Sequence, residues 1–279
     1  MKISKIICAV LMFCLPFSAF AWCQEGFVVG YQYPAQWQPN DWDKIQYLNK
    51  QSAKTITIMN PSSGPGTVAI QDYTDELQDI VDGGFHVSTA SKQIRVVAYV
   101  STKYGAEPLQ SVKDQIDLYA SLYPSPAIKG IFLDEMPFDD PNGDHAIYYD
   151  AITQHITDVY GANSLVVLNP GTYPEQTFVT GLSIWGSTNR VKVVTFEGSW
   201  ATYQTITPPA WAYGQPTEKF VHIVYAAPST AKLTALSLTK TNHVKYAYIT
   251  DDVITDGNPF DVLTTYWSAL INKINACDY

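Results

Sequence analysis

A regular alternation of short apolar runs and amphipathic stretches constrains the fold of this chain more than any other feature. Eight runs rich in Val, Ile, Phe and Tyr recur along it, at residues 27–31, 55–59, 94–100, 130–134, 165–168, 191–196, 220–225 and 246–250. Most of these runs are continuously apolar, which is typical of strands covered on both faces in a parallel sheet.

The connections between these runs predict the covering helices. Apolar residues recur at helical spacing in the stretches 73–81, 109–120, 147–159 and 260–274. The Pro-rich connection 207–217 predicts only a short helix. Asn258 and Pro259 combine a cap residue with a proline suited to the first helical position, so we expect the last helix to begin there.

Eight strand–helix units predict an α/β fold, a single (β/α)8 TIM barrel, whose usual size is about 250 residues. An open doubly wound sheet is the alternative, but it usually has a Gly-rich phosphate loop after its first strand. Residues 30–34 read Gly-Tyr-Gln-Tyr-Pro instead. No Gly/Ser-rich linker divides the chain, so we expect one barrel domain over residues 22–279.

The amino terminus has the features of a secretory signal peptide. Lys2 and Lys5 precede an almost wholly apolar run, residues 6–20, and Ala-Phe-Ala at 19–21 offers a cleavage site. We therefore expect residues 1–21 to be removed and the protein to be secreted or periplasmic. An uncleaved anchor is the alternative, but the run is shorter than the roughly 20 residues that span a bilayer. No second run of that length predicts a membrane span in the mature chain.

The charge balance narrows the choice of partner. Once Lys2 and Lys5 are lost from the 17 basic residues, 15 remain against 26 acidic ones, a net charge of −11. The chain has no basic patch to meet phosphates, so we expect no nucleic-acid partner. Such an acidic, aromatic-rich chain favours a polar partner that is uncharged or cationic.

Cleavage would also remove Cys8 and Cys14 and leave Cys23 and Cys277 at the two ends of the mature chain. In an oxidising compartment a lone pair of cysteines predicts a disulfide. This pairing requires the two termini to meet, as they do in a closed barrel. Two unpaired buried thiols are the alternative.

Acidic residues follow two of the predicted strands at the point where each strand ends. The segments Gly-Ile-Phe-Leu-Asp-Glu at 130–135 and Val-Val-Thr-Phe-Glu at 193–197 are apolar runs that stop in acid. Active sites of (β/α)8 barrels lie at the carboxyl ends of the strands, and glycosidases use two carboxyl groups around the scissile bond. Asp134, Glu135 and Glu197 are therefore the candidate catalytic residues. Successive strand residues point to opposite faces, so Asp134 and Glu135 cannot both point inward from a regular strand.

Other chemistries fit the sequence less well. The five histidines form no H-x-x-x-H or H-E-x-x-H pattern, and no G-x-S-x-G elbow is present. We therefore expect neither a metal nor another cofactor. Among the aromatic residues in loops, Trp200 lies three residues past Glu197 and is a candidate for stacking on a sugar ring, with packing against the barrel as the alternative.

Several motifs occur in a specific order. They are Asn-Pro-Ser-Ser-Gly-Pro-Gly at 60–66, Tyr-Val-Ser-Thr-Lys-Tyr-Gly at 99–105 and the acid-ending run at 130–135, with Leu-Asn-Pro-Gly at 168–171 and Thr-Phe-Glu at 195–197 further on. Over about residues 26–252 the chain resembles the spherulin-4 family (spherulation-specific family 4). It departs at Ala98, where the family often has Gly.

The resemblance implies a (β/α)8 glycoside hydrolase of the endo-α-1,4-N-acetylgalactosaminidase type, which cleaves inside polysaccharides. It implies catalytic roles for Asp134, Glu135 and Glu197. We expect Asp134 to act as nucleophile or base and Glu197 as general acid. The candidates for gripping sugar hydroxyls and the acetamido group are Asn60, Tyr104, Asn169 and Tyr225, although each Asn-Pro pair has a loop-forming role as its alternative.

Two alternative functions stay open at this point. One is hydrolysis of a different α-linked glycan by the same barrel, and the other is a non-catalytic wall or matrix protein that binds polysaccharide. A partly deacetylated galactosamine polymer is cationic, so an acidic and aromatic mouth would attract it, more weakly as salt rises. We expect the protein to act as a monomer.

Overall fold

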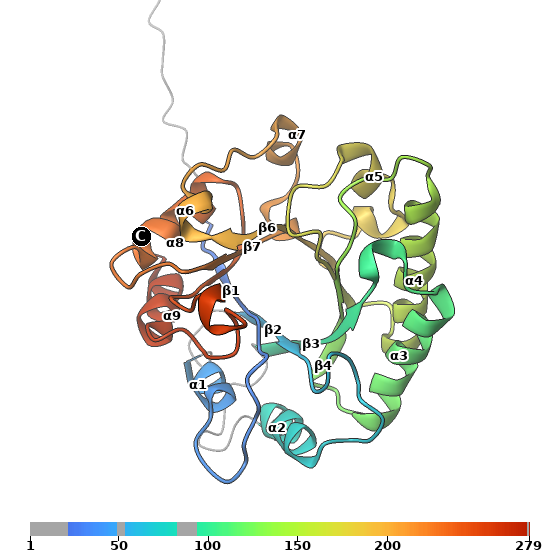
Figure 1. Ribbon diagram of the computed structural model, residues 1–279, viewed down its shortest axis with the longest axis horizontal. Coiled ribbons are helices and arrows are strands. Elements are labelled where there is room, and N and C mark those ends of the chain that lie inside the picture. The colour runs from blue at the N-terminus through green and yellow to red at the C-terminus, as the bar shows by residue number, and fades with distance from the viewer. Residues whose placement is uncertain (1–21, 49–53, 83–93, 278) are drawn as a thin grey trace, which may run out of the picture.

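Eight parallel strands close into a barrel within the part of the chain that the structure describes, residues 22–48, 54–82, 94–277 and 279 of a computed structural model. Neighbouring strands follow chain order, and β1 pairs with β8 to close the barrel (Figure 1). The strands are β1 (Glu25–Val28), β2 (Thr55–Met59), β3 (Ile94–Ser101), β4 (Ile128–Asp134), β5 (Leu165–Leu168), β6 (Val191–Ser199), β7 (Phe220–Tyr225) and β8 (Tyr246–Ile249). The predicted (β/α)8 barrel is thus confirmed.

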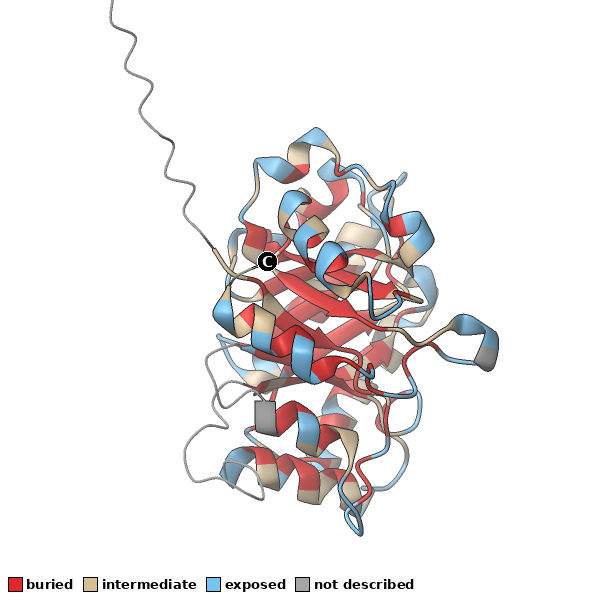
Figure 2. Cartoon of the chain, turned by 90° about the vertical axis from the view of Figure 1, so that its left-hand side faces the viewer, coloured by how far each residue is buried: buried red, intermediate tan, exposed pale blue. Residues whose placement is uncertain are grey.

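Helices surround the barrel, with exposed residues outward and buried residues toward the strands (Figure 2). The α-helices are α1 (Asp41–Leu48), α2 (Gln71–Asp82), α3 (Leu109–Leu122), α4 (Asp144–Tyr160), α5 (Gln176–Gly181), α6 (Trp200–Tyr203), α7 (Ala210–Tyr213), α8 (Lys232–Thr241) and α9 (Trp267–Ala276). Short 3₁₀ turns are η2 (Lys103–Gly105), η3 (Ser183–Gly186), η4 (Thr217–Lys219) and η5 (Ile254–Asp256). The short α7 matches the Pro-rich connection at 207–217.

The predicted start of the last helix is wrong. α9 begins at Trp267, not at Asn258 and Pro259. The Asn258 side chain instead accepts a hydrogen bond from the backbone of Phe260 (3.1 Å), which closes a turn. This turn lets the Phe260 ring pack edge-on against Tyr31, with ring centroids 6.5 Å apart. The segment therefore lies over the barrel mouth.

The first strand also begins earlier than predicted. β1 starts at Glu25, which pairs with Tyr246 of β8, and it ends at Val28. Tyr31 consequently lies beyond the strand, in the connection to α1. From this connection its ring packs edge-on against Tyr99 at the mouth.

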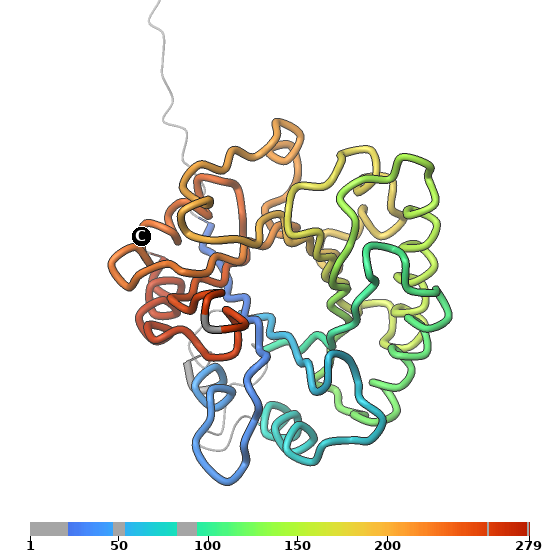
Figure 3. The backbone as a smooth tube through the Cα atoms, viewed as in Figure 1, coloured from blue at the N-terminus to red at the C-terminus, as the bar shows by residue number. Residues whose placement is uncertain are grey.

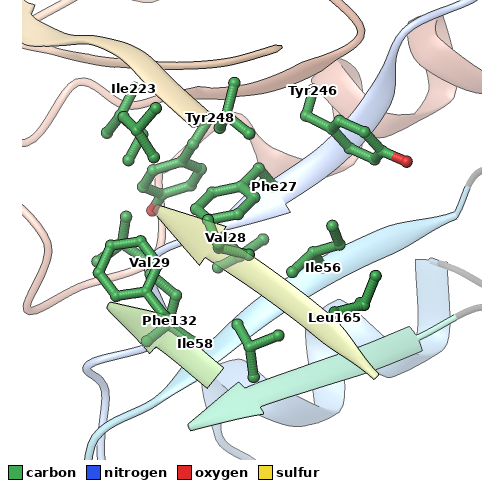
Figure 4. Close-up of a cluster of buried hydrophobic side chains, with 14 of the residues drawn as sticks. Phe27, Val28, Val29, Ile56, Ile58, Phe132, Leu165, Ile223, Tyr246 and Tyr248 are labelled. Carbon is green, nitrogen blue, oxygen red and sulfur yellow. The ribbon is translucent and has the colours of Figure 1, made fainter. Parts of the chain in front are cut away.

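Large apolar side chains fill the barrel interior (Figure 4). Phe27, Phe132 and Tyr248 are at most 1% exposed, and the rings of Phe27 and Phe132 lie 6.3 Å apart. Tyr99 stacks on Phe132 from above, with centroids 6.1 Å apart and planes 27° apart. The barrel is thus a packed core, and a ligand has room only at its ends.

Each of the two strands that end in acid has one extra residue in its pairing with one neighbouring strand. Val96 and Val97 of β3 pair with Ile128 and Gly130, so Lys129 has no partner in this pairing. Likewise Thr195 of β6 is passed over in the pairing with β7. Bulges of this kind re-aim the side chains that follow them.

The chain ends meet beside the barrel. The Cys23 and Cys277 sulfurs form a disulfide with a Cα–Cα distance of 5.2 Å, across 254 residues of sequence. The predicted disulfide is confirmed. The predicted signal peptide at residues 1–21 lies outside the described residues. Among those that are described, no helix is both long and apolar enough to cross a bilayer.

Candidate active site

A cavity of about 1000 Å³ opens at the carboxyl ends of the strands. Its lining includes all three candidate catalytic residues and four of the five candidate substrate-binding residues: Asn60, Tyr104, Asp134, Glu135, Asn169, Glu197 and Tyr225. The barrel therefore gathers side chains that lie up to 165 positions apart in the sequence.

One amide group bridges the two acids at the centre of the cavity. Asn169, directly after β5, donates from Nδ2 to Asp134 Oδ1 (2.7 Å) and to Glu197 Oε2 (2.8 Å). Because both oxygens contact the same nitrogen, they lie no further apart than 5.5 Å, the total of these two distances. Asp134 at the end of β4 and Glu197 near the end of β6 thus face one another across β5.

A tyrosine holds the other oxygen of Asp134. The Tyr99 hydroxyl donates to Asp134 Oδ2 at 2.8 Å. The Asp134 carboxylate therefore accepts one hydrogen bond on each oxygen, and hydrogen bonds of this kind favour its ionised form. The Tyr99 ring is in turn fixed by stacking on Phe132, so the contact between Tyr99 and Asp134 is preorganised.

The surroundings raise the pKa of both acids. Burial penalises the charged form of Glu197 and raises its pKa to about 7; the negative charge of Asp134 adds to this shift, and the Asn169 hydrogen bond opposes it. Burial also raises the pKa of Asp134, while the hydrogen bonds from Tyr99 and Asn169 pull it back. Glu197 is thus poised to hold a proton near neutral pH, as a general acid requires.

Glu135 lies beside this pair in an unusual backbone conformation. Its φ is +53°, in the left-handed region that non-glycine residues seldom adopt. Its carboxylate accepts a hydrogen bond from Ser101 Oγ at the end of β3. The turn at Glu135 lets two consecutive acids line one cavity, which a regular strand does not allow.

The candidate substrate-binding residues occupy different places. Tyr104 lines the cavity with its side chain 64% exposed, and Tyr225 lines it from the end of β7. Asn60 also lines it, but its side-chain oxygen accepts from the backbone of Gly64 (3.0 Å), so it shapes its own loop. Trp200 is not among the lining residues; its ring packs against Tyr203 at 6.3 Å.

Sequence reasoning missed two features of the site. Tyr99 was hidden inside an apolar strand, although Tyr99 and Ser101 alternate with buried residues in a way that marks one face of β3. The last helix was expected to begin at Asn258 and Pro259, whereas the segment 254–260 supplies Ile254, Asn258 and Phe260 to the cavity wall. Only the position of this segment after the last strand pointed to the mouth. Over the described residues, no group of three His, Cys, Asp or Glu side chains is arranged to hold a metal ion.

Comparison with known proteins places the chain in a family. The family model described as spherulation-specific family 4 matches residues 20–274. The chain belongs to this family. Spherulin-4 of Physarum polycephalum is 36% identical over 140 residues, which span 50% of this chain and 37% of that protein. The match therefore covers well under half of the curated relative.

Solved structures share the barrel. A crystal structure of Aspergillus clavatus Sph3 in complex with GalNAc has a TM-score of 0.73 at 21% identity, covering 91% of this chain and 98% of that one. The xyloglucan-specific endo-β-1,4-glucanase XEG5A from a metagenomic library has a TM-score of 0.51 at 9% identity, covering 92% and 97%. The Rhizomucor miehei chitinase RmChi1 has a TM-score of 0.50 at 11% identity, covering 91% and 99%. At these identities the likeness concerns the fold.

Proposed function

We propose that this spherulation-specific family 4 member is a secreted glycoside hydrolase. It cleaves internal α-1,4 bonds in polysaccharides that contain N-acetylgalactosamine or galactosamine. The observation that carries the proposal is the Asn169 amide, which holds Asp134 and Glu197 together at the centre of an open cavity. Two carboxyl groups that face one another, one of them with a pKa of about 7, are the machinery that glycosidases use.

The proposed reaction has two steps. Glu197 gives its proton to the glycosidic oxygen while Asp134 attacks the anomeric carbon, so the glycosidic bond breaks as a glycosyl ester forms. Glu197 then takes a proton from water, whose oxygen attacks the same carbon and releases Asp134. Each residue returns to its starting state after one bond has been hydrolysed. Glu135 is proposed to position the sugar beside this pair.

The close approach of the two bridging oxygens supports retention of anomeric configuration. Retaining glycosidases place their carboxyl groups about 5–5.5 Å apart, whereas inverting ones need about 6.5–9.5 Å to admit a water. The bridging oxygens here lie at most 5.5 Å apart, as the two contacts of 2.7 and 2.8 Å require. In an α-linked galactosamine the C2 acetamido group lies cis to the leaving group, so backside attack must come from the enzyme.

The substrate class has three supports. The motifs at 60–66 and 130–135 resemble those of the family's galactosaminidases, and a protein with the same fold was crystallised with GalNAc. The net charge of −11 after loss of the leader favours a cationic, partly deacetylated polymer. Secretion is supported by the disulfide between Cys23 and Cys277, since disulfides persist in oxidising compartments.

The test is release of reducing ends from an α-1,4-linked N-acetylgalactosamine polymer, with a galactan and polygalacturonate in parallel. We expect new reducing ends from the first polymer only. Release of reducing ends from another polymer would show that the substrate is a different glycan. Binding without release from any polymer would favour a non-catalytic matrix protein. NMR of the first-formed ends should show the α anomer, and the β anomer would contradict the proposed nucleophile.

A further inference from the structure

The connection from β1 to α1 carries an aromatic pair at the surface. Trp37 is 73% exposed and Tyr33 is 48% exposed. Their ring centroids lie 6.2 Å apart with 40° between the planes. Single exposed apolar side chains are common, but two adjoining rings make a continuous apolar surface, and such surfaces mark binding sites.

Ring contacts tie this pair to the core. Tyr33 packs edge-on against Tyr73 with centroids 5.8 Å apart, and Tyr73 packs edge-on against Trp42 at 6.4 Å. Tyr73 and Trp42 are 3% and 1% exposed. The aromatic residues therefore form a ladder that rises from the core and ends with the pair at the surface.

Hydrogen bonds fix the loop between the two rings. The Gln36 amide donates to the Pro34 carbonyl (3.1 Å), the Asp72 carbonyl (3.3 Å) and Glu76 Oε2 (3.1 Å). A hydrogen bond from the Tyr33 hydroxyl to the Asp72 side chain raises the pKa of this phenol. The surface is thus held in place, which lowers the entropy cost of binding.

The pair lies just beyond the wall of the catalytic cavity. The Tyr73 hydroxyl contacts the carbonyl of Asn60 at 3.5 Å, and Asn60 lines the cavity. Tyr31, another lining residue, precedes Tyr33 by two positions in the same connection. Figure 3 traces this connection as the blue loop between β1 and α1, beside α2 at the rim of the barrel. The pair is therefore placed where a polymer that extends past Asn60 could reach it.

We propose that Trp37 and Tyr33 form a second binding site for the polysaccharide, on which a sugar ring outside the catalytic cavity stacks. This inference rests on the proposed function and adds a place at which the same chain is held. The apolar face of a hexosamine ring fits an aromatic face. An amine on a deacetylated unit gains attraction from the rings and from the Asp72 carboxylate.

The test is the kinetics of Trp37→Ala on N-acetylgalactosamine polymers of graded length. We expect KM for the long polymer to rise about three- to tenfold with kcat retained, the size and form that loss of one aromatic contact gives. The ratio of variant to wild-type KM should fall toward one as the chain shortens. Trp37→Phe should raise KM for the long polymer less than Trp37→Ala does, and Tyr33→Ala should raise it as Trp37→Ala does.

The matched control is Tyr213→Ala. Tyr213 is an aromatic residue of α7 that is 49% exposed, and its ring packs against His243, just before β8 at the opposite end of the barrel. We expect its KM to equal that of the wild type. An unchanged KM in Trp37→Ala, or an equal rise in the control, would overturn the inference.

Failure of the proposed function gives a different pattern. If the wild type cleaves the polymer but Trp37→Ala is unaltered, only the aromatic site is refuted. If the wild type binds without cleaving, affinity electrophoresis of both proteins decides: weaker binding by Trp37→Ala supports the site although the hydrolase proposal fails. If the wild type neither binds nor cleaves, both proposals are refuted.

Discussion

At the scale of single residues, Asn169 contacts both of the facing acids. Its amide donates to both Asp134 and Glu197, and each bond lowers the pKa of the acid that accepts it. Without the amide both pKa values rise. The acidic limb of the pH profile requires ionised Asp134 and the basic limb requires protonated Glu197, so both limbs move to higher pH.

We therefore expect Asn169→Ala to shift the whole profile of kcat/KM upward in pH. The rate at the new optimum should fall at least about tenfold, as the loss of a charge-assisted hydrogen bond worth about 1.5–3 kcal/mol implies. Tyr99→Phe is the matched variant, because Tyr99 donates to Asp134 alone. It should move the acidic limb while the basic limb stays. A downward shift in either variant would be incompatible with these roles.

At the scale of elements, the strands followed from the sequence more closely than the site did. All eight strands begin and end within three residues of the apolar runs that predicted them, because buried parallel strands need continuous apolar sequence. β1 is displaced as a whole: it begins two residues before its predicted run and ends three residues early, at Val28. The extra residues Lys129 and Thr195 left no such trace, since a bulge depends on the pairing of two strands. For the same reason the acids were predictable as a group, while their orientations were not.

Gly130 is the element-scale position most sensitive to change. A Cβ there would lie 1.8 Å from the Leu165 carbonyl oxygen of β5. Backbone cannot give way at such a distance without disturbing the barrel, so we expect Gly130→Ala to lower the free energy of unfolding by at least about 3 kcal/mol. Gly181→Ala, where nothing lies within 4 Å, is the control and should be close to neutral. Urea denaturation measures both, and equal stability in the two variants would argue against the β4–β5 contact.

His222 makes β7 sensitive to acid. Its ring is buried between the hydroxyls of Tyr203 (2.9 Å) and Tyr173 (3.4 Å), and burial lowers its pKa from 6.5 to about 3. Between these pH values the unfolded chain takes up a proton that the folded chain does not. The contribution to stability is therefore complete above pH 6.5 and is lost as the pH falls toward 3, by up to about 1.4 kcal/mol per pH unit.

The variant His222→Gln should reduce this dependence. We expect it to be less stable than the wild type at pH 7, with the difference shrinking as the pH falls from 6.5 to 4. Glu197 titrates in the same range but is present in both proteins, so its contribution cancels in the difference. A difference that stays constant with pH would show that His222 is not held neutral.

At the scale of the whole molecule, the disulfide joins the first and last segments of the barrel domain. Cys23 and Cys277 close a loop that contains nearly the whole described chain. Such a constraint on the unfolded chain is typically worth about 2–5 kcal/mol. We expect reduction to lower the Tm of the wild type by several degrees. The Cys23→Ser/Cys277→Ser variant should have this lower Tm from the start, and reductant should not change it. A wild-type Tm that reductant also leaves unchanged would contradict a stabilising role of the disulfide.

The meeting of the two termini could be predicted from the sequence, whereas the path of the segment after β8 could not. Two cysteines at the ends of a chain of eight repeating units predicted a barrel whose termini meet, and they do. The closing segment was less predictable, because the Asn258 turn satisfies a helix-start pattern equally well. The position of this segment depends on the packing of Phe260 against Tyr31 at the mouth, a contact between residues far apart in the sequence.

Comparison of wild type and Glu197→Gln on the same α-1,4-linked N-acetylgalactosamine polymer is the most direct test of the proposed carboxyl mechanism. The glutamine has the same shape but cannot give up a proton, so we expect the release of reducing ends to fall at least about a thousandfold. Polymer binding and the Tm should stay close to those of the wild type. Cleavage at the wild-type rate by a folded Glu197→Gln would contradict the account.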